Sequence, residues 1–349
     1  MPPIIYDGVV YWGSFDRNLY AIDLELGSLR WKLLTEGNIE FSPALMNNKI
    51  YVATSDVNGL ADDKNLLYSI NPSSGEVLWK SWLGKEYGIG ATTPVLAEGN
   101  MVFVGTYDSG MLSFDAESGH ILWINNDEKH ITGPPAHDGG IIYFSSSSTF
   151  YAVDSDTGKT IWKYETGGTI YSSPAISEEE VMFGSSDGMF YSLKRYSGRV
   201  SWTYDAESPI RSSPVVSGGT VYYADSSGEI YSHRIYDGSI RWKIDIGESV
   251  VSSPIAVDGR LLVAADDSRL LALDIGYKKA NPLLQEDKEI FDCLASGEIL
   301  SKNSNSKNTT SEGPPQDEND LAITGILLTI LFGILGIYFT IRYGRRKNS

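Results

Sequence analysis

The residues of this chain best suited to bind a metal lie in one short polar segment. Asp56, Asn58, Asp62 and Asp63, followed by Asn65, place hard oxygen donors at short spacing, and such donors suit Ca²⁺. The segment lacks the twelfth-position glutamate and the regular spacing of an EF-hand loop. Two interpretations therefore stay open, a calcium loop and a solvated polar hairpin.

A second group of residues has side chains that bind ligands or partner proteins. Glu40, Tyr171 and Arg211 each stand three residues before one of a series of spaced prolines, and Trp82 and Tyr87 lie between the second and third of these prolines. Charged groups and aromatic rings are the side chains that most often anchor a binding surface. We predict that these five residues lie on one face of the molecule and meet a ligand or partner there.

The residue types needed for catalysis do not form a recognisable set. His120, His130, His137 and His233 show no metal-binding spacing and no partnered serine motif, and the sequence has no phosphate-binding loop. We therefore predict no catalytic residue, no bound cofactor and no enzymatic activity.

Two regular patterns indicate what positions these residues. Prolines recur with spacings of 41, 51, 40, 40, 40 and 40 residues, and a Gly-x-x-x-Trp motif runs beside them. The prolines are Pro2, Pro43, Pro94, Pro134, Pro174, Pro214 and Pro254. The six motif pairs are Gly27 with Trp31, Gly75 with Trp79, Gly119 with Trp123, Gly158 with Trp162, Gly198 with Trp202 and Gly238 with Trp242. A fixed period near 40 residues indicates one unit stacked on copies of itself.

Each unit is predicted to be a small antiparallel sheet. In the unit that starts at Pro214, Ile240, Trp242 and Ile244 alternate with polar residues, which is the period of a strand with one buried face. Glycine-rich turns separate this strand from three earlier short apolar runs. Four strands per unit predict an all-β fold, a β-propeller of seven visible four-stranded blades, with an eighth in a longer native chain. We interpret the motif glycine as a turn residue and the tryptophan as packing between blades.

The extended repeat Asp-x-x-x-Gly-x-x-x-Trp occurs at Asp23 to Trp31, Asp115 to Trp123 and Asp154 to Trp162. It resembles the tryptophan-docking repeat of the PQQ-repeat (quinoprotein-like) β-propellers, a family that includes quinoprotein alcohol dehydrogenases and BamB-like outer-membrane assembly proteins. The resemblance covers about residues 1–275. The resemblance implies that the dehydrogenases of the family are longer chains with a vicinal disulfide beside the quinone. This chain has one cysteine, Cys293, and so cannot form such a pair. The resemblance thus implies the fold and a BamB-like scaffold, with PQQ and Ca²⁺ as the alternative cofactors.

The second and seventh units depart from the period. From Pro43 to Trp79 there are 36 residues where the other complete units have 28 or 29, and the extra residues include Asp56 to Asn65. Because strands alternate in direction, loops from the second to the third strand and from the fourth strand to the next unit open on the same face, where function commonly lies. The seventh unit has no tryptophan, so its fourth strand is degenerate or comes from a segment such as Glu289 to Leu300.

The C-terminal part is predicted to attach the propeller, residues 1–285, to a membrane. Residues 286–320 are a predicted disordered stalk with an N-glycosylation sequon at Asn308, and residues 321–341 form 21 uncharged residues that predict a transmembrane helix. Residues 342–349 form a basic tail, which stays on the cytoplasmic side, so a single-pass protein with its propeller outside the cell membrane is expected. An outward N-terminus needs a signal peptide, and we predict that the native chain starts upstream of Met1. Small residues at spacings of three and four in the helix permit helix–helix association.

The net charge of the chain limits the classes of molecule that it is expected to bind. The net charge is −17, and it is −21 over the first 320 residues because four of the 28 cations lie in the tail. Such an acidic surface argues against nucleic acid as a partner. We expect a membrane-tethered, extracytoplasmic propeller that serves as a protein-binding scaffold in a cell-envelope complex. The alternatives are a quinoprotein dehydrogenase-like domain that binds PQQ and Ca²⁺, and a surface sensor of a ligand or glycan.

Overall fold

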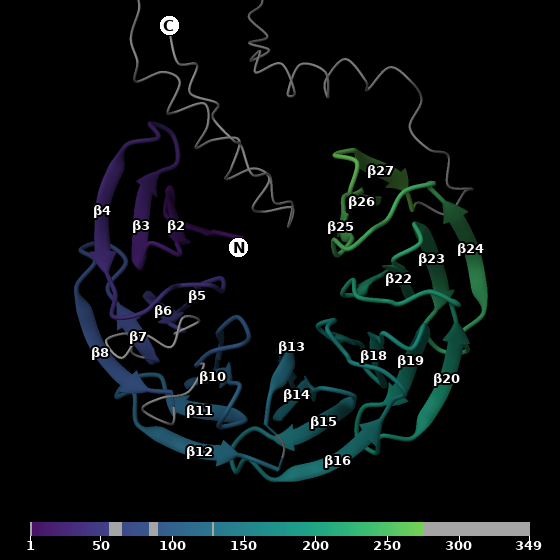
Figure 1. The fold of residues 1–349 in the computed structure, drawn as a ribbon, viewed down its shortest axis with the longest axis horizontal. Helices are drawn as coiled ribbons and strands as arrows, with labels where there is room; N and C mark the ends of the chain where they lie inside the picture. The colour runs from purple at the N-terminus through teal and green to yellow at the C-terminus, as the bar shows by residue number, and fades with distance from the viewer. Residues whose placement is uncertain (1, 56–64, 84–89, 128, 276–349) are drawn as a thin grey trace, which may run out of the picture.

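The computed structural model describes residues 2–55, 65–83, 90–127 and 129–275, and every regular element in these ranges is a β-strand. The strands form seven antiparallel sheets, six with four strands and one with three. The sheets follow one another around a common centre in chain order (Figure 1). This arrangement confirms the predicted all-β propeller, and we number the sheets as blades 1 to 7. Among the described residues, no strand pairing joins blade 1 to blade 7.

Each blade runs outward from its first strand to its last. The first strands are β1 (Ile4–Tyr6), β5 (Ala44–Met46), β9 (Leu96–Glu98), β13 (Ile131–Asp138), β17 (Ala175–Ile176), β21 (Val215–Ser217) and β25 (Ile255–Val257). The second strands are β2 (Val9–Gly13), β6 (Lys49–Ala53), β10 (Met101–Gly105), β14 (Ile141–Ser146), β18 (Glu180–Gly184), β22 (Thr220–Ala224) and β26 (Arg260–Ala264). These two layers lie toward the centre of the ring (Figure 1).

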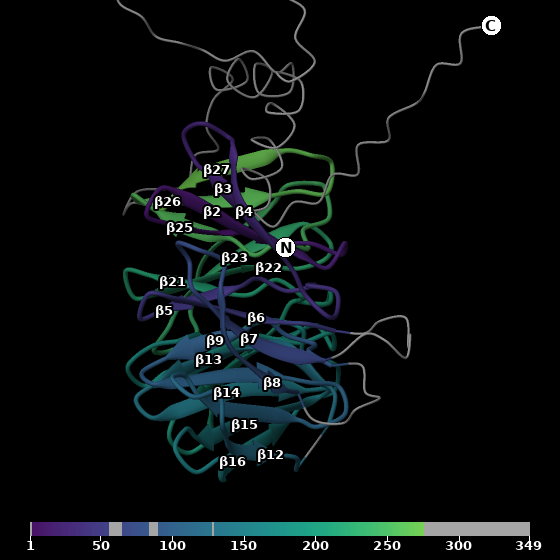
Figure 2. The same ribbon diagram turned by 90° about the vertical axis from the view of Figure 1, so that its left-hand side faces the viewer.

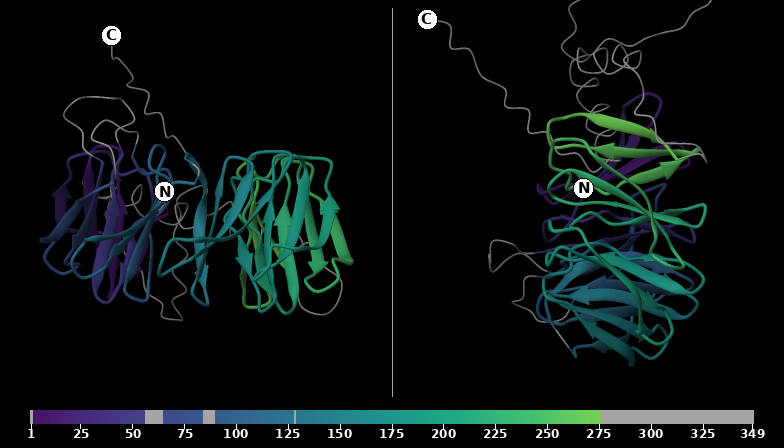
Figure 3. Two further views of the ribbon diagram at one scale, coloured as in Figure 1. Left: turned by 90° about the horizontal axis from the view of Figure 1, so that it is seen from below. Right: turned by 90° about the vertical axis from the view of Figure 1, so that its right-hand side faces the viewer.

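The outer half of each blade carries the repeat motif. The third strands are β3 (Asn18–Asp23), β7 (Leu66–Ile70), β11 (Met111–Asp115), β15 (Thr149–Asp154), β19 (Met189–Lys194), β23 (Glu229–Arg234) and β27 (Leu270–Asp274). The fourth strands are β4 (Leu29–Leu34), β8 (Val77–Trp82), β12 (Ile121–Asn125), β16 (Thr160–Glu165), β20 (Val200–Asp205) and β24 (Ile240–Asp245). Side views show the successive sheets packed beside one another (Figure 2) (Figure 3).

A motif tryptophan joins each of blades 1 to 5 to the blade that follows it. Trp162 lies in β16 of blade 4, and its indole N–H donates to the carbonyl oxygen of Arg195 in blade 5 at 2.9 Å. The same contact joins four other neighbouring pairs, at 2.9 Å from Trp31 to Pro72, 3.2 Å from Trp79 to Ala116, 2.8 Å from Trp123 to Ser155 and 2.7 Å from Trp202 to Ile235. The predicted packing of tryptophan between blades is therefore what the structure contains.

Two constraints, one on the backbone conformation and one on the space for a side chain, require glycine at the motif position. Gly198 has a φ of +67°, the left-handed region that suits a residue without a Cβ. A Cβ at Gly198 would also lie 2.7 Å from the indole of Trp162 in the preceding blade. The turn explains the first requirement, as the sequence predicts, and the tryptophan dock adds the second.

The cores lie between neighbouring blades, where aromatic rings stack. The rings of Phe150 and Phe183 are 4.1 Å apart between blades 4 and 5, and those of Phe190 and Tyr223 are 3.9 Å apart between blades 5 and 6. Such contacts bury large apolar surfaces and fix the angle between sheets. Each of blades 2 to 6 is thus stabilised mainly by its two neighbours.

Blade 7 has three strands within the described residues, β25 to β27. Four predictions concern residues outside those that the structure describes: a fourth strand for this blade, the stalk 286–320 with Asn308, the transmembrane helix 321–341 and the tail 342–349. Within the described ranges, none of the elements is a helix with the length and apolar character needed to span a membrane.

Candidate functional site

Two kinds of loop share one face of the propeller, which we call the loop face. It includes residues 14–17, 185–188, 225–228 and 265–269, which join second to third strands, and 35–43, 166–174, 206–214 and 246–254, which lead to the next blade. Hydrogen bonds join the two kinds, since the amide of Ala206 donates to Gly188 O at 2.9 Å and that of Ile246 to Gly228 O at 3.1 Å. The alternation of strand directions predicts this shared face.

Tyr171 and Arg211 come together on the loop face. They occupy the same position in consecutive loops, before blades 5 and 6, and the guanidinium carbon of Arg211 lies 5.7 Å from the centre of the Tyr171 ring. Tyr171 is 47% exposed, and Arg211 is also exposed. Val251, at the same position before blade 7, is exposed too. These three residues are exposed side chains at the same position of three consecutive loops, and we call them the loop-face series.

The backbone beneath this series is firmly held. The residue after Tyr171 is Ser172, whose buried hydroxyl donates to Gly184 O at 3.0 Å and accepts from Gly184 N–H at 3.1 Å. Ser212, after Arg211, makes the same pair of bonds with Ala224, at 2.7 and 3.0 Å. Each exposed side chain therefore starts from a loop that is tied to the second strand of its own blade.

The other predicted site residues do not join this pair. Glu40 is half-buried in the loop between blades 1 and 2, where its carboxylate accepts a hydrogen bond from the hydroxyl of Ser55. Trp82 ends β8 and is exposed. Tyr87 and the predicted calcium ligands Asp56, Asn58, Asp62 and Asp63 lie outside the described residues. Asn65, at the end of that segment, is described and buried.

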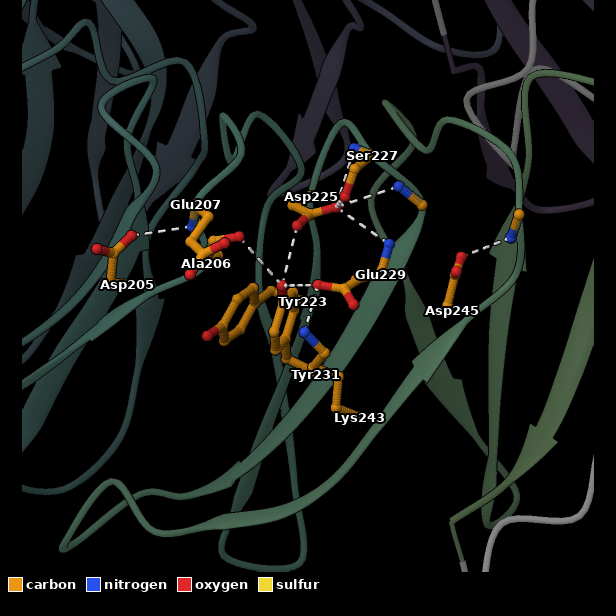
Figure 4. Close-up of polar contacts among 12 residues, drawn as sticks. Asp205, Ala206, Glu207, Tyr223, Asp225, Ser227, Glu229, Tyr231, Lys243 and Asp245 are labelled. Atoms are coloured by element: carbon orange, nitrogen blue, oxygen red, sulfur yellow. Dashed lines mark hydrogen bonds and ion pairs between the residues drawn. The ribbon is translucent and has the colours of Figure 1, made fainter.

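The structure also places a carboxylate cluster on the loop face of blade 6, at the turn between β22 and β23 (Figure 4). Asp225 is fully buried, and its Oδ1 accepts hydrogen bonds from Ser227 N–H at 2.9 Å, Ser227 Oγ–H at 2.7 Å and Glu229 N–H at 3.0 Å. The Tyr231 hydroxyl lies 3.0 Å from Asp225 Oδ2 and 2.5 Å from Glu229 Oε2. Lys243 completes the cluster with a 2.6 Å bond to Glu229.

The titration behaviour of this cluster points to a fixed, ionised arrangement. The hydrogen bond from Lys243 holds the pKa of Glu229 below its ordinary value, and the same bond raises the pKa of Lys243. Burial, followed by the hydrogen bond to Glu229, raises the pKa of Tyr231. A tyrosine with a raised pKa keeps its proton, and a glutamate with a lowered pKa keeps its charge, so Tyr231 and Glu229 are poorly suited to acid–base catalysis. The cluster instead orders the turn beside residues 206–214, because Tyr231 Oη also lies 3.4 Å from Ala206 O.

Blade 5 makes an equivalent contact with a different residue. There Asp187, the third residue of the turn, accepts a 2.8 Å hydrogen bond from Tyr191, whereas in blade 6 the carboxylate stands two positions earlier, at Asp225. Our sequence interpretation did not identify the blade 6 cluster. The exchange of Asp and Ser between Gly184-Ser-Ser-Asp-Gly188 and Ala224-Asp-Ser-Ser-Gly228 is the signal that marks it.

Among the described residues, no group of three or more His, Cys, Asp or Glu side chains is arranged to hold a metal ion. Ca²⁺ needs six to eight oxygen ligands, and the carboxylates of the blade 6 cluster are already occupied by N–H and O–H donors. The blade 6 cluster therefore does not fit a calcium site of the quinoprotein type.

Known proteins resemble this chain over part of their length. Outer membrane protein assembly factor BamB of Nitrosomonas eutropha is 29% identical over 136 residues, which cover 39% of this chain and 30% of that protein. Tetrathionate hydrolase of Acidithiobacillus ferrooxidans is 26% identical over 170 residues, which cover 48% of this chain and 28% of that protein. The chain thus spans less than a third of the length of these two relatives.

Solved structures resemble the propeller as a whole. BamB from Moraxella catarrhalis matches with a TM-score of 0.64 and 18% identity, over 80% of this chain and 84% of that one. A europium-containing methanol dehydrogenase matches with the same TM-score of 0.64 and 14% identity, over 81% and 78%. Likeness at this identity establishes the fold alone, since one fold hosts many functions.

A family model identifies the chain more directly. The model is described as outer membrane protein assembly factor BamB, and it matches residues 16–132, 125–235 and 207–279, in overlapping segments that cover most of the chain. These segments contain the six Gly-x-x-x-Trp motifs and the docks that they form. The chain belongs to the PQQ-repeat β-propeller family that this BamB model describes.

Proposed function

We propose that this protein is a membrane-tethered, extracytoplasmic β-propeller that binds protein partners in a cell-envelope complex through its loop face. Its family membership supports an assembly role, because several of the curated relatives are named as outer membrane protein assembly factors. Tethering is part of the proposal, and it is supported by the uncharged residues 321–341 and the basic residues after them.

The observation that carries the proposal is the exposed pair of Tyr171 and Arg211. Tyrosine and arginine are enriched among the residues that supply most of the energy of protein–protein binding. A ring stacked under a guanidinium costs little further order when a partner covers it, since the two groups already contact each other. The buried hydroxyls of Ser172 and Ser212 hold the two loops in place before any partner arrives.

Site-specific photocrosslinking in the native membrane tests the binding face. A benzoylphenylalanine at position 171 of the full chain is expected to give crosslinked products of reproducible mass, and Arg211→Glu is expected to remove them. Tyr236 provides the matched control, because it is highly exposed but lies in a turn between third and fourth strands, away from the loop face. Equal crosslinking from positions 171 and 236 would show that the loop face has no special role.

Membrane extraction tests the tether. The full chain is expected to stay with the membrane in alkaline carbonate, and a chain that ends at residue 320 is expected to be released. Release of the full chain would contradict membrane attachment through residues 321–341, but it would not bear on protein binding by the loop face.

The enzyme alternative has its own test. Titration calorimetry of the full chain with PQQ, in the presence and absence of Ca²⁺, is expected to show no stoichiometric binding. Calcium-dependent binding of one PQQ per chain would replace the scaffold with a quinoprotein, and an oxidoreductase assay would follow.

A further inference from the structure

The outermost strand of each blade is an exposed sheet edge, and one of these edges differs from the others. The six fourth strands have neighbours on one side only, so their outward N–H and C=O groups have no ladder partner in the sheet. Proteins commonly protect such edges with charged side chains, lysine above all, because an unprotected edge pairs with other chains. The residue after the motif tryptophan follows this rule in blades 1, 2, 4 and 6, where it is Lys32, Lys80, Lys163 and Lys243.

Strand β12 of blade 3 lacks this protection. Its sequence is Ile121-Leu122-Trp123-Ile124-Asn125, and it is the one fourth strand among the described residues with no charged side chain. Ile124 stands where four sibling strands have lysine, and Leu122 stands where blades 1 and 6 have Arg30 and Arg241. Blade 5 also has uncharged residues at both positions, Ser201 and Thr203, but these are polar. Among the described fourth strands, β12 is therefore the one in which both positions are apolar.

The apolar residues of β12 do not serve the core of the protein. Trp123 is buried in the contact with blade 4, but Ile121, Leu122 and Ile124 are 45%, 49% and 46% exposed. The one-residue register shift before the tryptophan also does not set β12 apart, since it occurs in all six blades whose fourth strand the structure describes. What distinguishes β12 is an exposed, uncharged edge.

Carboxylates flank this edge at both ends. Glu117 lies in the turn before β12, where its mostly exposed side chain already pairs with Lys49 of blade 2. Asp127 follows the strand and accepts a 2.6 Å hydrogen bond from the hydroxyl of Thr160. The whole chain carries a net charge of −17. A partner that is apolar in its middle and positive at its ends would complement both the strand and its surroundings.

We propose that the outer edge of β12 binds an extended segment of a partner protein, an apolar stretch with lysine or arginine at each end, which adds to blade 3 as a fifth strand. Main-chain hydrogen bonds would supply affinity, and the exposed Ile121, Leu122 and Ile124 would select apolar side chains. This inference rests on the proposed function of a protein-binding scaffold, but it assigns a second surface on the rim of the ring, apart from Tyr171 and Arg211.

The test measures binding of a defined peptide to the full chain in detergent. The probe is a fluorescein-labelled peptide of alternating valine and threonine with lysine at both ends, followed by fluorescence anisotropy. Ile124→Lys, which restores the residue of four sibling strands, is expected to weaken binding at least tenfold, and Leu122→Arg is expected to act in the same direction. Thr203→Lys makes the same change in β20 and is expected to leave binding unchanged. Circular dichroism would verify that each variant folds.

Two further peptides separate strand addition from simple adhesion. Methylation of alternate backbone amides should abolish binding, because it removes the main-chain donors, and glutamate ends should weaken it. Equal binding of the methylated peptide, or equal effects of Ile124→Lys and Thr203→Lys, would overturn the proposal. A dimer that light scattering detects and that Ile124→Lys dissociates would also overturn the proposal, because the edge of β12 would then bind a second copy of the chain.

The outcomes separate this inference from the proposed function. Loss of crosslinks from position 171 together with retained peptide binding at β12 would refute the loop face and leave the rim site standing. Retained crosslinks without peptide binding would refute the rim site alone.

Discussion

The docks between blades and the carboxylate turns of the loop face follow opposite rules in the same chain. The tryptophan dock is repeated between five pairs of neighbours with the same donor, the same acceptor position and the same glycine, as between Trp162 and Arg195. The carboxylate turns differ even between adjacent blades, with Asp187 in blade 5 and Asp225 in blade 6. Packing that every blade needs is thus uniform, and the loops that each blade presents to solvent are individual.

The largest expected effect comes from breaking one dock. Trp162→Ala removes a buried ring and its hydrogen bond, so we expect a loss of about 3–5 kcal/mol in the free energy of unfolding, measured by urea denaturation. Trp82→Ala, at an exposed tryptophan outside the motif, should cost much less. Similar losses from the two variants would contradict a special role for the docks.

Removing the carboxylate of Asp225 in blade 6 is expected to lower the free energy of unfolding by less than Trp162→Ala does. Asp225→Ser leaves buried N–H groups without their acceptor, and we expect a loss of about 2–3 kcal/mol. The double change of Asp225→Ser with Ser227→Asp recreates the turn of blade 5 and is expected to recover part of that loss. If the double variant is no more stable than Asp225→Ser, the two turns are not interchangeable solutions to one problem.

Acid is expected to have the next largest effect on stability, through a histidine that stands where the other blades have apolar residues. His233 is fully buried, and burial lowers its pKa below the ordinary value of 6.5. Below pH 6.5, His233 therefore binds a proton in the unfolded chain but stays neutral in the folded chain until the pH reaches its lowered pKa. Stability should therefore decline as the pH falls below 6.5 toward the folded pKa, by at most about 1.4 kcal/mol per pH unit.

His233→Leu is expected to remove this slope, although it also breaks the 3.1 Å contact with Tyr223 and so lowers stability at every pH. His120→Gln, at an exposed histidine, should keep the slope. Carboxylates such as Glu229, whose pKa is lowered from 4.5, lose their contribution only in more acid solution. A slope in His233→Leu equal to that of the parent chain between pH 6.5 and 5 would assign the effect to another group.

The smallest effect concerns a single loop residue. Glu207 has a φ of +62°, a conformation that favours glycine, and Gly247 takes it at the same position before blade 7. Glu207→Gly is expected to raise the free energy of unfolding by about 1 kcal/mol, and Gly247→Glu to lower it by about as much. Thermal denaturation would measure both, and a destabilised Glu207→Gly would mean that the carboxylate makes a contact worth more than the strain.

The contrast between docks and loops also explains what the sequence could predict. The tryptophan and glycine recur at one spacing because one packing solution recurs, so the period predicts blades, strands and docks. The same period places Tyr171 and Arg211 in equivalent positions 40 residues apart, which is why a shared face could be predicted for them. Their contact with each other required the structure.

The blade 6 cluster was not predictable from that period. It depends on the exact register that sets Tyr231 opposite Lys243, and on a carboxylate moved by two residues within a turn. No repeat marks such a change, because it occurs once. The edge of β12 is an intermediate case: its missing lysine is visible in the aligned repeats, but its exposure required the structure.

The direction of the docks has a consequence for biogenesis. Each of these five tryptophans donates forward, from the last strand of one blade to a carbonyl in the blade that follows it in the chain. A blade can therefore form its tryptophan dock as soon as the next 40 or so residues have been synthesised, before the C-terminus is made. A chain built this way can fold progressively from its N-terminal end as it leaves a ribosome or a translocation channel, and at each moment just one unlocked blade is exposed to proteases and chaperones.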